Sequence, residues 1–255
     1  MTQRPHLYRE LAKYYDLQYS WKDYRAEVRR LQEIVRRFGR SGSRSWLDVA
    51  CGTGKHLDLL RRRYECVGVD ASREMLRVAR RRLPGIRLHR ADMRTFALGR
   101  RFDVVSCLFS AVGHLDTERD LERAFSRFAD HLKPGGVAVV EPWILPSRAK
   151  PGHLHVRTYQ DPDLTLVRMA YSVVRGRRTF IRYYHLIGVP GRGIRFLEEV
   201  DRGLMVDPEG LKRLMRRAGL VPHFLARGFT RDRGLLIGVK PRAAKGRPRR
   251  SRGSP

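Results

Sequence analysis

Hydrophobic residues follow two alternating patterns between residues 25 and 141. Continuous apolar runs such as Ser45–Ala50 and Val137–Glu141 have the length of buried strands. Between such runs lie segments with apolar residues at helical spacing and basic residues elsewhere, including Arg25–Phe38 and Thr117–His131. Apolar strands separated by helices are typical of a parallel sheet covered on both faces. The pattern therefore predicts an α/β fold.

Further elements extend this predicted core. Helices are expected over residues 55–63, from Ser72 to Arg82 and from near Asp207 to Ala218, and strands at Cys66–Val69, Ile86–His89, Phe102–Phe109, Pro222–Phe229 and Gly234–Val239. Ser72 suits a helix start because its hydroxyl can accept a hydrogen bond from an unpaired amide of the first turn.

The pattern changes after Trp143. Two β-rich runs, Leu164–Val174 and Thr179–Val189, are flanked by turn signals that contain Gly, Pro and Asp. They predict an antiparallel sheet inserted at residues 144–206. We expect one folded domain over residues 1–239, with a helical N-terminal segment at 1–40, and a separate tail at 240–255.

The amino-acid composition gives the chain an unusually high positive charge. The 255 residues include 54 Lys and Arg against 26 Asp and Glu, a formal net charge of +28. Such a charge favours polyanions such as RNA, or small phosphorylated substrates. The tail at 240–255 has basic residues, Pro and Gly but no acid. It is predicted to be disordered, because it has almost nothing to bury.

Several classes of protein are disfavoured. No apolar run approaches the roughly 20 residues that cross a bilayer, and residues 1–10 lack a signal-peptide core. The protein is therefore expected in the cytoplasm, with no membrane partner. The cysteines Cys51, Cys66 and Cys107 lie singly in apolar segments, so neither a disulfide framework nor a metal site is expected.

A glycine-rich loop lies between the first predicted strand and the next helix. Gly52 and Gly54 permit a tight turn, and the helix start offers free amides to a ligand. A dinucleotide fingerprint would need a third glycine where Leu57 lies, and a phosphate-binding P-loop would need Ser or Thr where His56 lies. S-adenosylmethionine, which has no diphosphate, is the other nucleotide-like cofactor that uses this architecture.

Acidic residues follow the predicted strands where this cofactor needs them. Asp48 lies near the end of the first strand, beside the loop, and suits the methionine portion. Asp70 follows the second strand, where a carboxylate can accept hydrogen bonds from both ribose hydroxyls. Asp92 follows the third strand, where it can accept from the adenine amino group while Met93 lies against the ring.

These motifs resemble a known family. The similarity is carried by Leu47–Gly54, Ala91–Phe96, Phe109–Leu115, Glu141–Trp143 and Arg233–Leu235. Together they resemble the class I S-adenosylmethionine-dependent methyltransferases, and among them the N,N-dimethyltransferases of dTDP-amino-deoxysugars. The resemblance implies a Rossmann-like seven-stranded sheet with an antiparallel last strand, N-terminal lid helices and an inserted antiparallel sheet.

The resemblance also implies roles for individual residues. The expected catalytic residues are His114 and Tyr14; the expected cofactor-binding residues are Tyr15, Tyr24, Asp48, Ala50, Gly52, Gly54, Asp70, Ala71, Asp92, Met93 and Leu108; the expected substrate-binding residues are Tyr8, Trp143 and Arg233. A histidine can accept the proton that an ammonium group must lose before methylation, or it can orient the amine. Arg233 is expected to contact a diphosphate.

Three functions stay open from the sequence. The first is N-methylation of a small amine such as a nucleotide-linked amino deoxysugar, with S-adenosylmethionine as cofactor. The second is RNA methylation through the basic surface, although no motif for base chemistry is found. The third is a cofactor-binding regulator whose basic tail binds nucleic acid. A homodimer is compatible with all three.

Overall fold

The computed structural model describes residues 8, 11–39, 42–230 and 232–242. Its larger sheet has the strand order β10-β11-β5-β4-β1-β2-β3. These strands are β1 (Ser45–Val49), β2 (Glu65–Asp70), β3 (Arg87–Arg90), β4 (Phe102–Cys107), β5 (Leu132–Val140), β10 (Val221–Leu225) and β11 (Leu235–Val239). β11 runs antiparallel to both of its neighbours, β5 and β10. The predicted seven-stranded sheet with an antiparallel last strand is thus confirmed.

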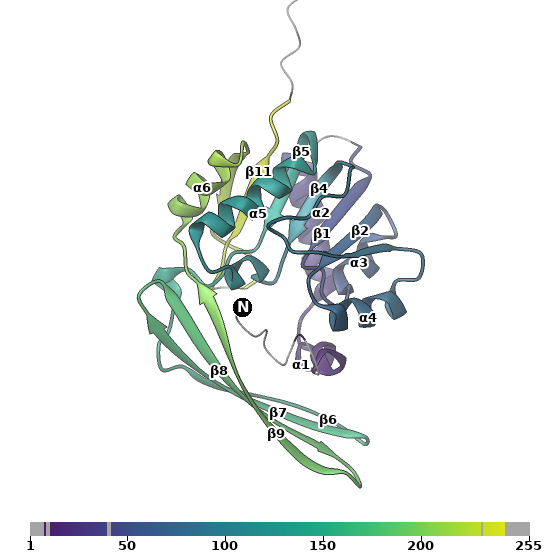
Figure 1. Cartoon of the computed structure of the whole chain (residues 1–255), viewed down its shortest axis with the longest axis vertical. Helices are drawn as coiled ribbons and strands as arrows, with labels where there is room; N and C mark the ends of the chain where they lie inside the picture. Colours follow the sequence, from purple (N-terminus) through teal and green to yellow (C-terminus); the bar gives the residue numbers. More distant parts are fainter. Residues whose placement is uncertain (1–7, 9–10, 40–41, 231, 243–255) are drawn as a thin grey trace, which may run out of the picture.

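Helices cover both faces of this sheet (Figure 1). They are α2 (Tyr24–Phe38), α3 (Lys55–Leu60), α4 (Arg73–Arg82), α5 (Glu118–Asp130) and α6 (Pro208–Arg217). Buried side chains of α5 and α6 pack with one face, whereas those of α2, α3 and α4 pack with the other. The central strands β1 and β4 are buried throughout, which explains their continuous apolar sequences.

Side-chain caps fix where four helices begin. Asp23, Ser72, Thr117 and Asp207 each accept a hydrogen bond from a backbone amide three residues later. Each cap satisfies one of the unpaired amides of the first turn. The cap predicted at Ser72 is confirmed, with a distance of 3.1 Å from the Met75 amide.

The inserted segment forms a separate antiparallel sheet in the order β6-β7-β8-β9. Its strands are β6 (Leu154–Asp161), β7 (Leu164–Arg175), β8 (Arg178–Val189) and β9 (Gly193–Leu204). Figure 1 shows this sheet projecting from one end of the α/β core, with the short helix α1 (Tyr15–Gln18) between the two. The expected insertion within residues 144–206 therefore forms four strands.

Some predicted boundaries shift. The strand expected at Pro222–Phe229 ends at Leu225, because its partner β11 begins at Leu235 and the two residues form the last pair. The helix expected to reach Arg63 ends at Leu60 and continues as a turn. In the expected N-terminal segment, α2 packs against the sheet, whereas the described residues before it, such as Tyr15 and Tyr19, lie over the sheet edge. At the start of the expected tail, Lys240 still bonds to the backbone of Gly135 and Gly136, and residues 243–255 lie outside the described part.

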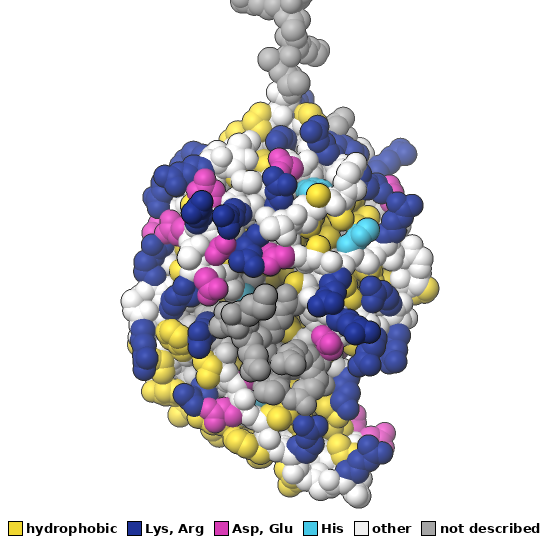
Figure 2. Space-filling view, viewed as in Figure 1, with side chains coloured by type: hydrophobic (Ala, Val, Ile, Leu, Met, Phe, Trp, Pro, Cys, Tyr) yellow, Lys and Arg dark blue, Asp and Glu magenta, His cyan; other side chains and the backbone are white. Residues whose placement is uncertain are grey.

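The charged side chains are dispersed over the visible surface. Figure 2 shows Lys and Arg side chains scattered over the whole visible face, with Asp and Glu between them. No helix among the described residues is long and apolar enough to cross a membrane.

Candidate active site

The glycine loop joins β1 to α3 at the carboxyl edge of the sheet. Ala50, Gly52 and Gly54 all have positive φ angles, of 58°, 56° and 78°. A Cβ on Gly54 would lie 2.5 Å from Cδ1 of Leu83, so glycine is required there for space as well as for conformation. A Cβ on Gly52 would meet no atom within 4 Å, which leaves open space beside the loop.

Two acids lie at this edge, and one of them, Asp70, bonds to the loop. The half-buried Asp70 accepts hydrogen bonds from the amides of Gly52 (2.9 Å) and Ser72 (2.7 Å). Asp48 is buried and accepts a hydrogen bond from the Ser106 hydroxyl at 2.6 Å. Burial raises the pKa of Asp48 from 3.8 to about 6. The loop, Asp48 and Asp70 are therefore together at one edge, as expected from the sequence.

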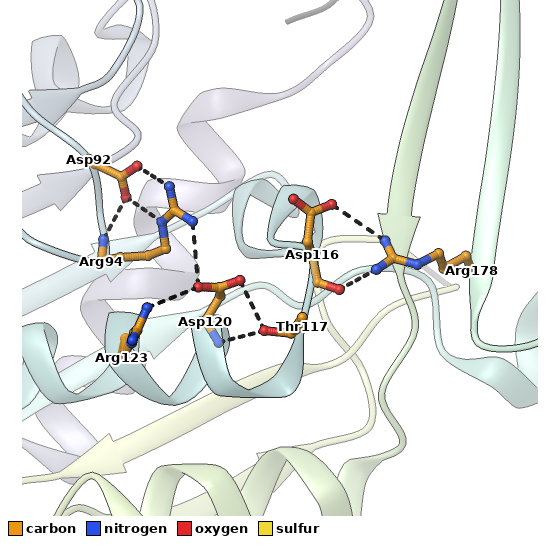
Figure 3. Close-up of polar contacts among 7 residues, drawn as sticks. All are labelled: Asp92, Arg94, Asp116, Thr117, Asp120, Arg123 and Arg178. Atoms are coloured by element: carbon orange, nitrogen blue, oxygen red, sulfur yellow. Dashed lines mark hydrogen bonds and ion pairs between the residues drawn. The ribbon is translucent and has the colours of Figure 1, made fainter. Parts of the chain in front are cut away.

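Asp92 lies farther along the same edge, after β3. Arg94 donates to both of its carboxylate oxygens, from Nε at 3.0 Å and from Nη2 at 2.7 Å, and its Nη1 reaches Asp120 at 3.5 Å (Figure 3). The Arg94 amide also donates to Asp92 Oδ1, at 2.8 Å. The sequence reading missed Arg94, although it lies two residues after Asp92. The expected neighbour Met93 is half-buried and packs on the core.

The end of β4 turns sharply into the segment that carries His114. Phe109 and Ser110 have positive φ angles of 51° and 60°, which are costly for residues with side chains. The Phe109 amide donates to Glu141 Oε2 at 2.7 Å, and the Ser110 hydroxyl donates to the Pro142 carbonyl at 2.6 Å. These bonds hold the turn, which continues into the 3-10 helix Ala111–His114. The buried Leu108 precedes this turn.

His114 is held between two partners. Its Nε2 lies 3.2 Å from the Tyr8 hydroxyl, and its Nδ1 lies 3.1 Å from Oδ1 of Asp201. Asp201 belongs to β9 of the inserted sheet and is 7% exposed. With the carboxylate accepting from Nδ1–H, the imidazole presents Nε2 as an acceptor to Tyr8. Sequence reasoning missed Asp201.

Trp143 packs behind His114. The two ring centroids are 5.4 Å apart, and the Trp143 Nε1–H donates to the Thr179 hydroxyl at 2.6 Å. A Cβ on Gly113 or Gly203 would lie within 2.4 Å of the indole, so both glycines are needed for its close fit. Trp143 is 7% exposed, and its indole ring forms a wall that supports His114.

The N-terminal tyrosines occupy three different places. Tyr8 and Tyr15 lie in one cluster at the sheet edge, with ring centroids 6.2 Å apart. Tyr24 contacts His56 after the glycine loop, at 5.0 Å between centroids. Tyr14 instead packs with Leu11 and the inserted sheet. The structure therefore brings Tyr8, and not Tyr14, to His114.

Asp16 ties this N-terminal segment to the glycine loop. Its Oδ1 accepts from the Thr53 hydroxyl at 2.7 Å, and its Oδ2 pairs with Arg82 at 2.5 Å. Arg82 also donates to the Thr53 carbonyl at 2.5 Å. We refer to Asp16, Thr53 and Arg82 as the lid latch. The sequence reading did not single out any of the three.

Arg233 lies at this edge near two acids, although its buried Nε has no hydrogen-bond partner among the described residues. Its Nη1 is 3.8 Å from Glu141 and its Nε is 3.6 Å from Asp232. Glu141 is fully buried, and burial raises its pKa. Ala71 follows Asp70 and is half-buried at the same edge.

A mostly parallel sheet in this strand order, with a glycine loop and acids at its carboxyl edge, defines a class I S-adenosylmethionine-dependent methyltransferase. A family model described as a methyltransferase domain matches residues 47–136.

Comparison with similar proteins assigns the chain to one family within this class. The chain is 42% identical to the dTDP-3-amino-3,6-dideoxy-alpha-D-glucopyranose N,N-dimethyltransferase of Streptomyces fradiae, over 94% of both chains. The crystal structure of DesVI from Streptomyces venezuelae is 38% identical with a TM-score of 0.85, covering 90% of this chain and 98% of that one. SAM-bound CalS10, an amino pentose methyltransferase from Micromonospora echinaspora, is 35% identical with a TM-score of 0.78, covering 86% and 92%. The chain belongs to the family of sugar N,N-dimethyltransferases, and its cofactor is S-adenosylmethionine.

Proposed function

We propose that this enzyme dimethylates the amino group of a dTDP-linked amino deoxysugar. Two of its relatives are named as N,N-dimethyltransferases of dTDP-3-amino sugars. The observation that carries the proposal is the placement of His114 between Tyr8 and Asp201, at the sheet edge that holds the cofactor loop. This arrangement suits an acceptor that arrives protonated and must lose a proton.

The cofactor supplies an electrophilic methyl group when bound. Asp70 would accept hydrogen bonds from the ribose hydroxyls, Asp48 would lie beside the methionine portion, and Asp92 would accept from the adenine amino group. Gly52 and Gly54 allow the backbone to approach the ligand, while Tyr15 covers the same edge.

Tyr8 and His114 prepare the acceptor. An amino sugar is an ammonium ion at neutral pH and has no free lone pair. Tyr8 accepts a proton from the ammonium nitrogen while its own hydroxyl proton passes to Nε2 of His114. The Asp201 carboxylate then stabilises the positive charge on the imidazole. The neutral amine, held in place, has the lone pair that attacks the methyl carbon.

Trp143 and the lid complete the site. The Trp143 ring packs against the His114 imidazole, and the lid latch holds the N-terminal segment over the glycine loop. Exclusion of water strengthens the charge interactions in the site and protects the reactive groups.

Transfer to defined acceptors tests the proposal. Purified enzyme is incubated with labelled S-adenosylmethionine and either dTDP-3-amino-3,6-dideoxyglucose, its 3,4,6-trideoxy analogue or a 4-amino isomer. We expect label in the nucleotide sugar and successive mono- and dimethylated products by mass spectrometry. No transfer to any dTDP-amino sugar would sink the proposal. Label in RNA under the same conditions would favour the other substrate class.

A further inference from the structure

The two helical layers of the core differ in charge. Helices α2 and α4, on one face of the sheet, contain ten arginines and three acids. Helices α5 and α6, on the other face, contain seven basic residues and five acids. The layer of α2 and α4 is therefore far more positive than the layer of α5 and α6.

Ion pairs neutralise one layer but not the other. Five basic residues of α5 and α6 pair with acids: Arg123, Arg127, Lys212, Arg213 and Arg217. In α2 and α4, only Arg30 and Arg82 have an acidic partner among the described residues. The other eight arginines of these two helices are all exposed, and we call them the arginine face: Arg25, Arg29, Arg36, Arg37, Arg73, Arg77, Arg80 and Arg81.

The arginine face follows the exposed stripes of its two helices. Arg73, Arg77 and Arg81 are four residues apart, so they lie along one stripe of α4 at intervals of about 6 Å. Arg25 and Arg29 repeat this spacing on α2. Like charges at this spacing repel each other and destabilise a helix. A bound polyanion would remove this repulsion.

Helix α3 joins the two helices into one continuous layer. It packs against α2, and a Cβ on Gly54 at its start would meet Leu83, directly after α4. The turn that follows α3 adds Arg62 and Arg63, which are exposed and have no acidic partner within the described part of the chain. Figure 1 shows α4 on the opposite side of the core from α6.

This layer has no apolar anchor. Among the residues that the structure describes, none of the exposed large hydrophobic side chains lies in α2, α3 or α4. A protein interface needs an apolar or aromatic centre, and a membrane-bound helix inserts apolar side chains into the lipid. Phosphates need only cations, and a guanidinium can bind phosphate through two parallel hydrogen bonds. The bases of a single strand would need aromatic rings to stack on, so a duplex fits this surface better.

We propose that the arginine face binds the phosphates of double-stranded DNA, independently of base sequence. Binding of this kind is driven by the release of cations from the duplex, and it needs several arginines on one surface. None of the eight arginines belongs to the candidate active site, so the inference does not rest on the proposed function. It gives the high positive charge of the chain a role that methylation of a small amine does not require.

Fluorescence anisotropy with a labelled DNA duplex of about 20 base pairs tests the proposal over a range of salt concentrations. One variant of the full chain removes four charges from the arginine face: Arg29→Gln, Arg36→Gln, Arg77→Gln and Arg81→Gln. The control variant removes four charges from paired arginines of the other layer: Arg123→Gln, Arg127→Gln, Arg213→Gln and Arg217→Gln. The two variants therefore have the same net charge.

We expect wild-type binding to weaken steeply with salt. In the arginine-face variant, the slope of log K against log salt should be smaller by about 3 to 4, because each lost phosphate contact removes about 0.9. Its affinity at about 0.1 M salt should be about 100-fold lower or less, whereas the control variant should stay within a few-fold of wild type. Methyl transfer should be unchanged in both variants.

Three results would overturn the proposal. Wild-type protein that does not bind the duplex would do so directly. Equal losses in the two variants would show that net charge alone matters, and unchanged binding in the arginine-face variant would place the contact elsewhere, such as in residues 243–255. Polyglutamate that displaces the duplex at equal charge would show that the surface accepts an acidic protein instead. Methyl transfer on the same samples tests the proposed function separately.

Discussion

His114 Nδ1 lies 3.1 Å from Oδ1 of Asp201, which joins the α/β core to the inserted sheet at the proposed reaction centre. The base of the inserted sheet is anchored close by. Arg178 of β8 pairs with Asp116 and with its carbonyl, two residues beyond His114 (Figure 3). The inserted sheet therefore orients the imidazole.

Replacing Asp201 should separate catalysis from cofactor binding. Asp201→Asn removes the negative charge that stabilises the protonated imidazole, so we expect kcat to fall by about 10- to 100-fold. The Kd of S-adenosylmethionine should not change, because Asp201 is not at the glycine loop. Steady-state kinetics across pH and cofactor titration measure both, with Asp163→Asn in the exposed β6–β7 turn as control. Equal kcat values for the two variants would show that Asp201 has no part in the reaction.

Tyr8 and His114 should act as one unit. Tyr8→Phe keeps the ring contacts with Tyr15 and His114 but removes the hydroxyl that transfers the proton. We expect a lower kcat for Tyr8→Phe and for His114→Ala. The double variant should be no slower than the slower single variant, because groups in one relay are not additive. Fully multiplicative losses in this double-mutant cycle would mean independent roles.

Gly203→Ala should disturb the reaction centre through Trp143. The new Cβ would lie 1.9 Å from Cε2 of the indole, so Trp143 must move away from its place behind His114. We expect a loss of about 1–3 kcal/mol in the free energy of unfolding, together with a lower kcat. The matched control is Gly188→Ala in β8, where the nearest neighbouring side-chain atom, Cγ1 of Ile194, would be 3.8 Å from the Cβ. Chemical denaturation and kinetics should distinguish the two; equal behaviour would contradict the fit described for Trp143.

The α/β core was predictable because its signals are local. Continuous apolar strands, helix caps and glycines in turns depend on neighbouring residues, and the positions of Asp48 and Asp70 then follow from the carboxyl edge of a parallel sheet. The cofactor side of the site is therefore predictable from local sequence features.

The acceptor side depends on long-range packing. Asp201 lies in a strand with charged residues on both faces, so alternation alone does not show that Glu199 and Asp201 are buried while Glu198 and Arg202 are exposed. Periodicity could not decide between Tyr8 and Tyr14 as the partner of His114, because this segment combines short 3-10 and α-helical turns, which have no single period.

Breaking the lid latch should accelerate cofactor release. Asp16→Ala removes the acceptor for Thr53 and the partner of Arg82, both next to the glycine loop. We expect the dissociation rate of S-adenosylmethionine to rise by about 5- to 20-fold, which corresponds to about 1–2 kcal/mol. Stopped-flow measurements would compare it with Asp58→Ala, which breaks the partly exposed pair between Asp58 of α3 and Arg61 at its end. A rate equal to that of the control would rule out the latch.

Asp48→Asn should make the ligand-free protein more stable at neutral pH while weakening cofactor binding. Burial raises the pKa of Asp48 from 3.8 to about 6. Between these two pH values the folded chain keeps the Asp48 proton, whereas the unfolded chain has released it. The stability that Asp48 contributes is therefore full below about pH 4 and is lost as the pH rises through about 6, a difference of about 3 kcal/mol. Asparagine keeps an acceptor for the Ser106 hydroxyl without this cost. Denaturation at a series of pH values should show the variant more stable than wild type at pH 7.5, with the gap closing towards pH 4; a gap independent of pH would contradict the raised pKa.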